Sequence, residues 1–79
     1  MVHTLLHDDH YYYDIIRKNI TKYRKKANLT QQQLADKAGI SMNYIAKIES
    51  KKMQRGFTIV VAGRIADALG IDIRLLFEN

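Results

Sequence analysis

The chain has 79 residues, a length that suits one small domain and leaves no room for a deep substrate cavity beside its core. Hydrophobic residues make up 47% and charged residues 27%, cysteine is absent, and no apolar run approaches the roughly 20 residues of a membrane span. These values predict a soluble single domain without disulfides, and the lack of a secretion leader favours a cytoplasmic protein with no membrane partner.

The formal net charge of +5 is spread unevenly along the chain. Between residues 17 and 55, eleven lysines and arginines stand against two acidic residues, whereas the two flanks together carry two basic and six acidic residues. A basic middle between acidic ends suggests a surface that meets a polyanion such as nucleic acid, although an ordinary solvated helix surface has the same composition. The spacing of the hydrophobic residues, and the motifs it reveals, are needed to distinguish a nucleic-acid-binding surface from a solvated one.

Residues 1–12 are expected to form a partly ordered N-terminal arm. His3, His7 and His10 are spaced so that a helix would place them on one face, where they could bind a metal such as zinc. Chain ends usually fray, however, and the three tyrosines at 11–13 more simply pack against the first helix or a partner subunit. No metal site and no cofactor are therefore predicted.

A first amphipathic helix is expected over roughly residues 13–26, because apolar residues recur there at helical spacing: Ile16, Ile20, Tyr23 and Ala27. Thr30 is a good N-cap for a second helix, with Gln33 at the capping-box position. Gly39 should end that helix, because glycine adopts the left-handed conformation at little cost. The second helix is expected to bury Leu34, Ala35 and Ala38.

Three further helices are predicted beyond residue 40. Ser41 caps the first of these, which turns Ile45 and Ile48 inward and is followed by a basic, glycine-containing loop. Thr58 caps the next, which ends at Gly70; its isoleucines and valines favour strands, but a 3.6-residue period continues through the segment. This helix is expected to bury Ile59, Ala62, Ile65, Ala66 and Leu69. Asp72 then caps a short fifth helix carrying Ile73, Leu76 and Phe77.

The stretch LTQQQLADKAGISMNYIAKIE, residues 29–49, resembles the helix-turn-helix of the Xre and Cro repressor family. It has that family's Leu-Thr-Gln opening, its Leu-Ala pair, its Gly-Ile-Ser turn and its closing Ile-Glu, and the likeness extends over residues 15–77. The loop after Glu49 is longer than usual, and Phe57 stands where the family often has proline. The resemblance implies an all-α, compact five-helix, lambda-repressor-like DNA-binding domain over residues 13–79, with the helix-turn-helix at its second and third helices.

The same resemblance assigns DNA contacts to individual residues. Met42, Asn43 and Lys47 match the positions that read bases: asparagine can pair with adenine, lysine can reach guanine, and the methionine thioether can pack on a thymine methyl. Contacts to the phosphate backbone are expected from the start of the second helix, from the recognition helix and from the basic loop that follows it. The phosphate candidates are Gln31, Gln32, Tyr44, Lys51, Lys52 and Arg55, of which Gln32 can equally be an ordinary exposed residue.

Two further sets of residues have structural roles. Arg24 and Glu49 match a family pair in which an ion pair links the first helix to the end of the recognition helix. Apolar residues left over once the core is assigned indicate a dimer interface on the last two helices. That interface is expected to contain Val60, Val61, Leu75 and Phe77.

Together these features predict a sequence-specific DNA-binding transcriptional regulator, a repressor that acts as a homodimer on a two-fold operator in double-stranded DNA. Two alternatives stay open: the antitoxin of a toxin-antitoxin pair, with a toxin protein as partner, and the controller protein of a restriction-modification pair. An enzyme is not expected, because there is no cysteine and every histidine lies near the N-terminus.

Overall fold

The computed structural model describes residues 6–51 and 56–79. Lys52 and Arg55, two of the predicted phosphate contacts, lie outside these residues, as does His3. Four α-helices and one 3-10 helix follow in chain order, and the described residues contain no strand: α1 (Asp9–Lys26), α2 (Gln31–Ala38), α3 (Met42–Glu49), α4 (Ile59–Leu69) and η1 (Ile73–Phe77). The predicted all-α fold is confirmed, with the difference that the fifth element is a 3-10 turn.

Helix α1 begins earlier than the apolar pattern indicates. The Asp8 carboxylate caps the helix by accepting hydrogen bonds from the backbone N–H groups of His10 at 3.0 Å and Tyr11 at 3.1 Å. The first turns of α1 therefore form ahead of Ile16, the first buried residue. Residues 9–12, which the sequence places in the arm, belong to this helix, because a cap can start a helix before any apolar periodicity appears.

The four N-caps predicted from the sequence are all present. Thr30 Oγ1 accepts a hydrogen bond from the backbone N–H of Gln33 at 3.0 Å, and the side-chain oxygen of Gln33 accepts one from the N–H of Thr30 at 2.9 Å. Ser41, Thr58 and Asp72 likewise cap α3, α4 and η1. Local hydrogen bonding thus sets where these helices begin.

The core gathers residues from every element, but two of its expected members are exposed and two others, Tyr23 and Leu69, are only half-buried against it. Ile59 is 63% exposed, and Ala27 is exposed because it lies one residue beyond the end of α1. Phe57, just before α4, is buried instead, and its ring packs edge-on against Tyr13. The buried apolar residues are Ile16, Ile20, Leu34, Ala35, Ala38, Ile45, Ile48, Phe57, Ala62, Ile65, Ala66 and Leu76.

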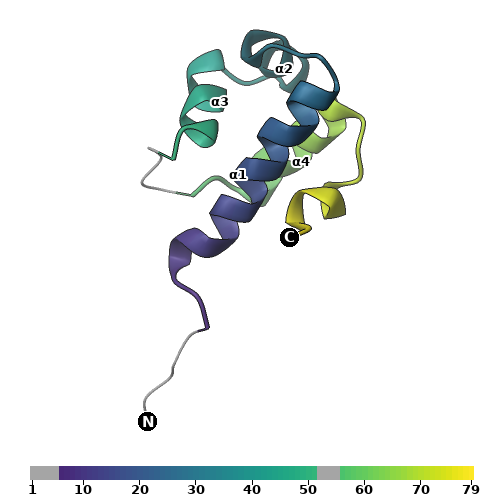
Figure 1. Cartoon of the computed structure of the whole chain (residues 1–79). Coiled ribbons are helices and arrows are strands. Elements are labelled where there is room, and N and C mark those ends of the chain that lie inside the picture. The colour runs from purple at the N-terminus through teal and green to yellow at the C-terminus, as the bar shows by residue number, and fades with distance from the viewer. Residues whose placement is uncertain (1–5, 52–55) are drawn as a thin grey trace.

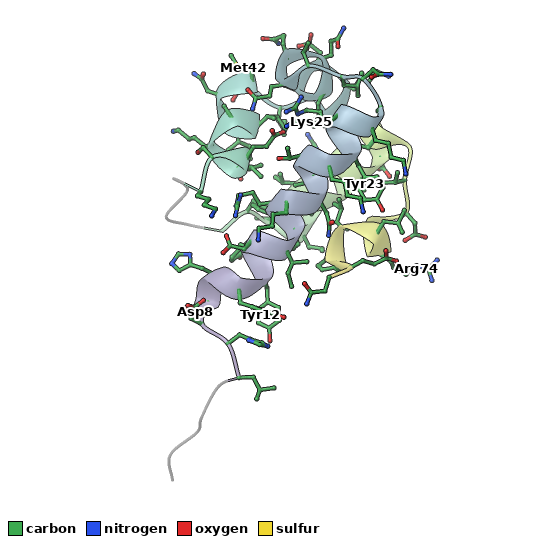
Figure 2. The ribbon with its side chains drawn as sticks, in the orientation of Figure 1. Asp8, Tyr12, Tyr23, Lys25, Met42 and Arg74 are labelled. Atoms are coloured by element: carbon green, nitrogen blue, oxygen red, sulfur yellow. The ribbon has the colours of Figure 1, made fainter. Side chains whose placement is uncertain are left out.

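Helix α1 is the spine of the molecule (Figure 1). Helices α2 and α3 lie together near its C-terminal end, α4 lies behind it, and η1 packs along its side. In Figure 2, Met42 at the start of α3 and Tyr12 near the start of α1 therefore lie at opposite ends of the molecule. No helix in the described part of the chain is both long enough and apolar enough to cross a membrane.

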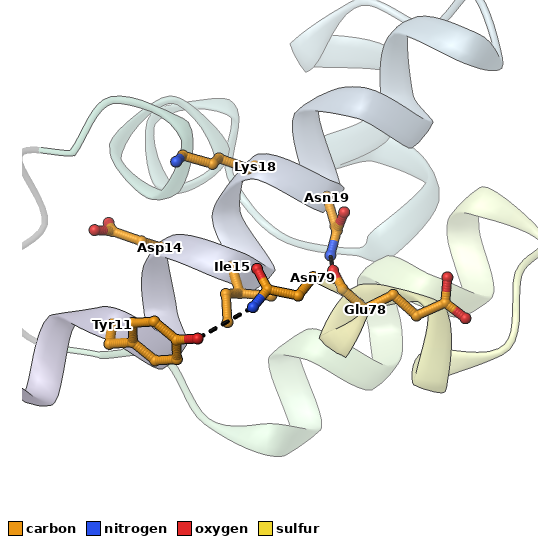
Figure 3. A pocket seen from close by; sticks show the side chains of 7 residues that line it. All are labelled: Tyr11, Asp14, Ile15, Lys18, Asn19, Glu78 and Asn79. Carbon is orange, nitrogen blue, oxygen red and sulfur yellow. Dashed lines mark hydrogen bonds between the residues drawn. The ribbon is translucent and has the colours of Figure 1, made fainter. Parts of the chain in front are cut away.

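The C-terminal segment is fastened to α1 by the buried side chain of Asn19. Its Nδ2 donates to the carbonyl oxygen of Leu76 at 2.8 Å and to that of Glu78 at 2.7 Å. A third bond joins the Asn79 amide to the Tyr11 hydroxyl at 3.1 Å (Figure 3). Because these bonds join residues far apart in the sequence, they fix the path of the chain after η1.

Candidate nucleic-acid interface

A three-residue turn joins α2 to α3 and sets the angle between them. Gly39 ends α2 in the left-handed conformation, with φ of 70°, and the Ile40 N–H then bonds to the Ala35 carbonyl oxygen at 3.1 Å. Ser41 Oγ accepts from the Tyr44 N–H at 3.1 Å and starts α3 at once. A side chain with a Cβ at position 39 would strain this turn, since L-residues adopt positive φ at a cost.

The outer face of α3 carries the predicted base-reading residues. Met42, Asn43 and Lys47 are exposed, while Ile45 and Ile48 on the opposite side are buried in the core. Tyr44 is half-buried and packs against that core. The core contacts of α3 therefore hold a fixed surface of one amide, one ammonium group and one thioether toward solvent, groups that suit base edges in a major groove.

The three consecutive glutamines at the start of α2 have three different surroundings. Gln31 is half-buried, and its Nε2 donates to Glu49 Oε1 at 3.3 Å. Gln32 is exposed and donates to Asp36 one turn later at 2.8 Å, and Gln33 completes the capping box. Helix α2 also presents its N-terminal end here, where backbone N–H groups and the helix dipole favour an anion such as phosphate.

Arg24 and Glu49 lie together in a bidentate ion pair. Arg24 Nε is 2.8 Å from Glu49 Oε2 and Arg24 Nη2 is 2.9 Å from Oε1, while Arg24 Nη1 donates to the Leu29 carbonyl oxygen at 2.9 Å. The side chains are 13% and 7% exposed. This network connects α1, the turn after it, α2 and the end of α3, because Gln31 also reaches the same carboxylate.

The ion pair sets the charge state of both groups. Burial raises the pKa of Glu49, but hydrogen bonds from Arg24, Gln31 and Thr21 outweigh burial and hold that pKa below its usual value. The bond to Glu49 raises the pKa of Arg24. Glu49 is therefore ionised at neutral pH and is a firm anchor for the Gln31 amide.

Arg17 is a second arginine at this junction, and it is buried although it lies off the apolar face that Ile16 and Ile20 define on α1. It is 9% exposed, and its Nη2 lies 3.0 Å from Asp14 Oδ1 while Nη1 donates to the Glu49 carbonyl oxygen at 3.5 Å. The hydrogen bond from Arg17 lowers the pKa of Asp14. Asp14 three residues before Arg17 is the sequence signal for this pair, but nothing local shows that α3 covers it.

The residues just after α3 carry the remaining predicted phosphate contact. Lys51 is exposed, adopts the left-handed conformation with φ of 65°, and lies near enough to Asp14 for its charge to lower that carboxyl's pKa. The chain therefore bends sharply as it leaves α3, and it carries Lys51 along the side of α1. The continuation of this basic loop falls in residues 52–55, outside the described residues.

The predicted dimer residues do not share one environment. Val60 and Phe77 are exposed, whereas Val61 and Leu75 are half-buried, and Val61 packs against the core. Phe77 instead lies beside Tyr12, Tyr13 and Ile59 around an apolar groove. Among the described residues, no three histidines, cysteines or carboxylates come together as a metal site.

Comparison with known proteins supplies relatives for this arrangement. Residues 20–76 match the sequence profile of the helix-turn-helix family. The chain is 33% identical over 66 residues to the control protein C.SmaI of Serratia marcescens, a match that covers 84% of this chain and 76% of that protein. It is 38% identical over 58 residues to the immunity repressor protein of Bacillus phage phi105, covering 73% of this chain but only 39% of that protein.

A solved structure has the same fold over its whole length. The restriction-modification controller protein C.AhdI from Aeromonas hydrophila is 29% identical to this chain, with a TM-score of 0.72, and the match covers 84% of this chain and 100% of that one.

Proposed function

The chain belongs to the helix-turn-helix family, and we propose that it is a sequence-specific DNA-binding transcriptional regulator, a repressor that acts as a homodimer on a two-fold operator. One observation carries the proposal: Asn43 and Lys47 stand exposed on α3, while Ile45 and Ile48 fix the opposite side of that helix in the core. A helix held in this way can enter a major groove without rearrangement.

Base reading falls to three side chains of α3. The Asn43 amide donates to adenine N7 and accepts from the adenine N6 amino group. Lys47 donates to guanine O6 or N7, and Met42 packs on a thymine methyl. The first turn of α3 carries Met42 and Asn43, the part of a recognition helix that meets base edges most closely.

Phosphate contacts surround this helix. Gln31 binds a phosphate with its side-chain amide and with the N-terminal end of α2, and Gln32 and Tyr44 are proposed as further phosphate contacts. The bond from Gln31 to Glu49 supports this role, because it fixes the amide before DNA arrives. Lys51 adds a positive charge just after α3, and Lys52 and Arg55 are proposed as further phosphate contacts.

The relatives favour a second, narrower role, that of a restriction-modification controller protein. C.AhdI is described as a restriction-modification controller, and the control protein C.SmaI matches over 76% of its own length. The phage repressor is matched over only 39% of its own length. The genes beside this one decide the matter: a restriction and modification pair supports the controller role, and a toxin gene supports an antitoxin.

The test begins with a selection of bound sites from a library of random duplexes. Affinity for the selected site should fall by orders of magnitude between about 50 and 200 mM salt, because phosphate contacts release counterions. Failure to retain any duplex at low salt would refute the proposed function. The operator obtained in this way then becomes the probe for single substitutions.

Asn43→Ala and Lys47→Ala should each lose roughly 1 to 3 kcal/mol of discrimination at one base position, whereas Gln31→Ala should weaken binding to all sequences alike. Arg74→Ala is the charge control for Lys47→Ala, since both remove one positive charge but Arg74 lies on η1, away from Met42 in Figure 2. Equal losses for every sequence in all three test variants would contradict the proposed recognition surface, even if DNA binding itself holds.

A further inference from the structure

An apolar groove of about 330 Å³ runs between the first turns of α1, the start of α4 and the end of η1. Ile16 and Phe57 form its buried floor. Its rim consists of four large side chains that remain exposed to solvent: Tyr12 at 59%, Tyr13 at 38%, Ile59 at 63% and Phe77 at 47%. The floor is thus part of the core, while the rim is apolar surface that the folded chain leaves uncovered.

Exposed apolar surface is concentrated at this groove. The described residues contain seven exposed large hydrophobic side chains, and four of them form the rim. Of the other three, Met42 lies on the proposed recognition helix, Val60 follows Ile59, and Leu6 precedes α1. Scattered apolar residues need no explanation, but a contiguous patch of this kind marks an interaction surface.

Part of the rim is also held in place before any partner arrives. Tyr13 packs edge-on against Phe57, with ring centroids 5.2 Å apart, and covers Gly56 so closely that a Cβ there would overlap with its ring. Phe77 lies between Leu76 and Glu78, whose carbonyl oxygens both accept from the buried Asn19 amide. A prefixed surface loses less conformational entropy on binding than a loose one.

Three of the four rim residues, and the Asn19 side chain that holds the segment carrying Phe77, lie outside the family match. The match covers residues 20–76, whereas Tyr12, Tyr13, Asn19 and Phe77 all lie beyond its two ends. The two flanks therefore add a surface that the helix-turn-helix family alone does not account for.

We propose that this groove binds a second copy of the chain, so that the N-terminal turns of α1 form half of the dimer interface. The proposal rests on the homodimer of the proposed function and places its interface. A second copy suits the position of the groove, because Tyr12 and Met42 lie at opposite ends of the molecule and docking would leave both recognition helices free (Figure 2).

The area of the rim supports this occupant. At about 200 Å² for each large side chain, the four exposed fractions amount to roughly 400 Å² of apolar surface. A standard interface buries about 800 Å² on each partner, of which a little over half is apolar. The dimer face expected from the sequence exposes less apolar area than such an interface needs, because Val61 and Leu75 are already half-buried against their own chain. The tyrosines of α1 supply the difference.

The test is the dimer dissociation constant of the full chain without DNA, measured by sedimentation equilibrium. Tyr12→Lys and Ile59→Lys should each raise it at least about tenfold, because a lysine must lose water when the rim is covered. Val60→Lys is the matched control, and it separates this groove from the face expected from sequence, to which Val60 belongs. Val60 is also 63% exposed and lies next to Ile59 in the first turn of α4, but it does not line the groove. The control should change the constant by less than about twofold, and thermal melts should show every variant folded.

Three results would overturn the proposal: a wild-type chain that stays monomeric at several hundred micromolar, a Tyr12→Lys or Ile59→Lys variant that dimerises normally, or a Val60→Lys control that dissociates as readily as Ile59→Lys. The first of these would point to a different protein as occupant. Binding of a duplex carrying one half-site separates this result from the proposed function. The Ile59→Lys monomer should bind that duplex as the wild-type protomer does, and absence of binding by both would refute the DNA-binding role instead.

Discussion

Replacing Arg24 by methionine should destabilise the fold while leaving the exposed face of α3 chemically unchanged. Arg24 donates three side-chain hydrogen bonds, two to Glu49 and one to the Leu29 carbonyl oxygen. Methionine fills part of the same space but offers no donor, so Glu49 is left buried with only Gln31 and Thr21 as donors.

The magnitude follows from the burial of the pair. Removing one partner of a buried ion pair costs about 3 to 5 kcal/mol, since the other charge stays desolvated. The lower end applies here, because Arg24 is 13% exposed and Glu49 keeps the bond from Gln31. A loss of about 3 kcal/mol in a domain of this size should lower the melting temperature by roughly 12 to 24 °C.

Urea and thermal unfolding followed by circular dichroism measure this loss, and the double variant Arg24→Met with Glu49→Leu is its control. Removing both charges together should restore most of the lost stability, because an apolar pair in the same space carries no stranded charge. Chemical denaturation of the wild type, Arg24→Met, Glu49→Leu and the double variant completes a double-mutant cycle that isolates the energy of the pair.

The pH dependence has a definite sign. The folded-state pKa of Glu49 is lowered, so in the wild type the contribution of this group is present above the unfolded pKa and is lost as the pH falls through the folded one. Without Arg24, burial should raise the folded pKa instead, and acidification should then favour the folded variant. The difference in unfolding free energy between the wild type and Arg24→Met should therefore become smaller as the pH falls from about 7 to about 4.

An Arg24→Met protein that has the melting temperature of the wild type yet fails to bind the operator would refute this account and make Arg24 a DNA ligand.

Two further substitutions test contacts around the groove. Asn19→Ala should cost about 2 kcal/mol in urea unfolding, because it leaves the Leu76 and Glu78 carbonyl oxygens without their donor; an unchanged midpoint would mean that water replaces the amide. Gly56→Ala should push the Tyr13 ring off Phe57 and cost about 1 kcal/mol, the value of an aromatic pair. Loss of the nuclear Overhauser contact between the two rings would report this shift, and its retention would count against the close packing at Gly56.

The sequence by itself determined the helices and the turn between α2 and α3. Thr30 and Ser41 cap helices whose bonded N–H groups lie three residues away, and Gly39 ends α2 in its own left-handed conformation. Each of these interactions joins residues only a few positions apart, so it can be predicted from the sequence alone. The cap at Asp8 is equally local, and α1 was expected to begin later only because the apolar period begins later than the cap.

Tertiary structure alone decided the partners of the polar side chains and the surface that stays apolar. Arg17 and Asn19 look like exposed residues of an amphipathic helix, yet they are buried because α3 and the segment after η1 pack over them. Phe57 takes the core position expected for Ile59, and that exchange leaves Ile59 on the groove. Periodicity gives the direction in which a side chain points from its own helix, but burial depends on which distant segment covers that direction, and only the assembled fold determines it.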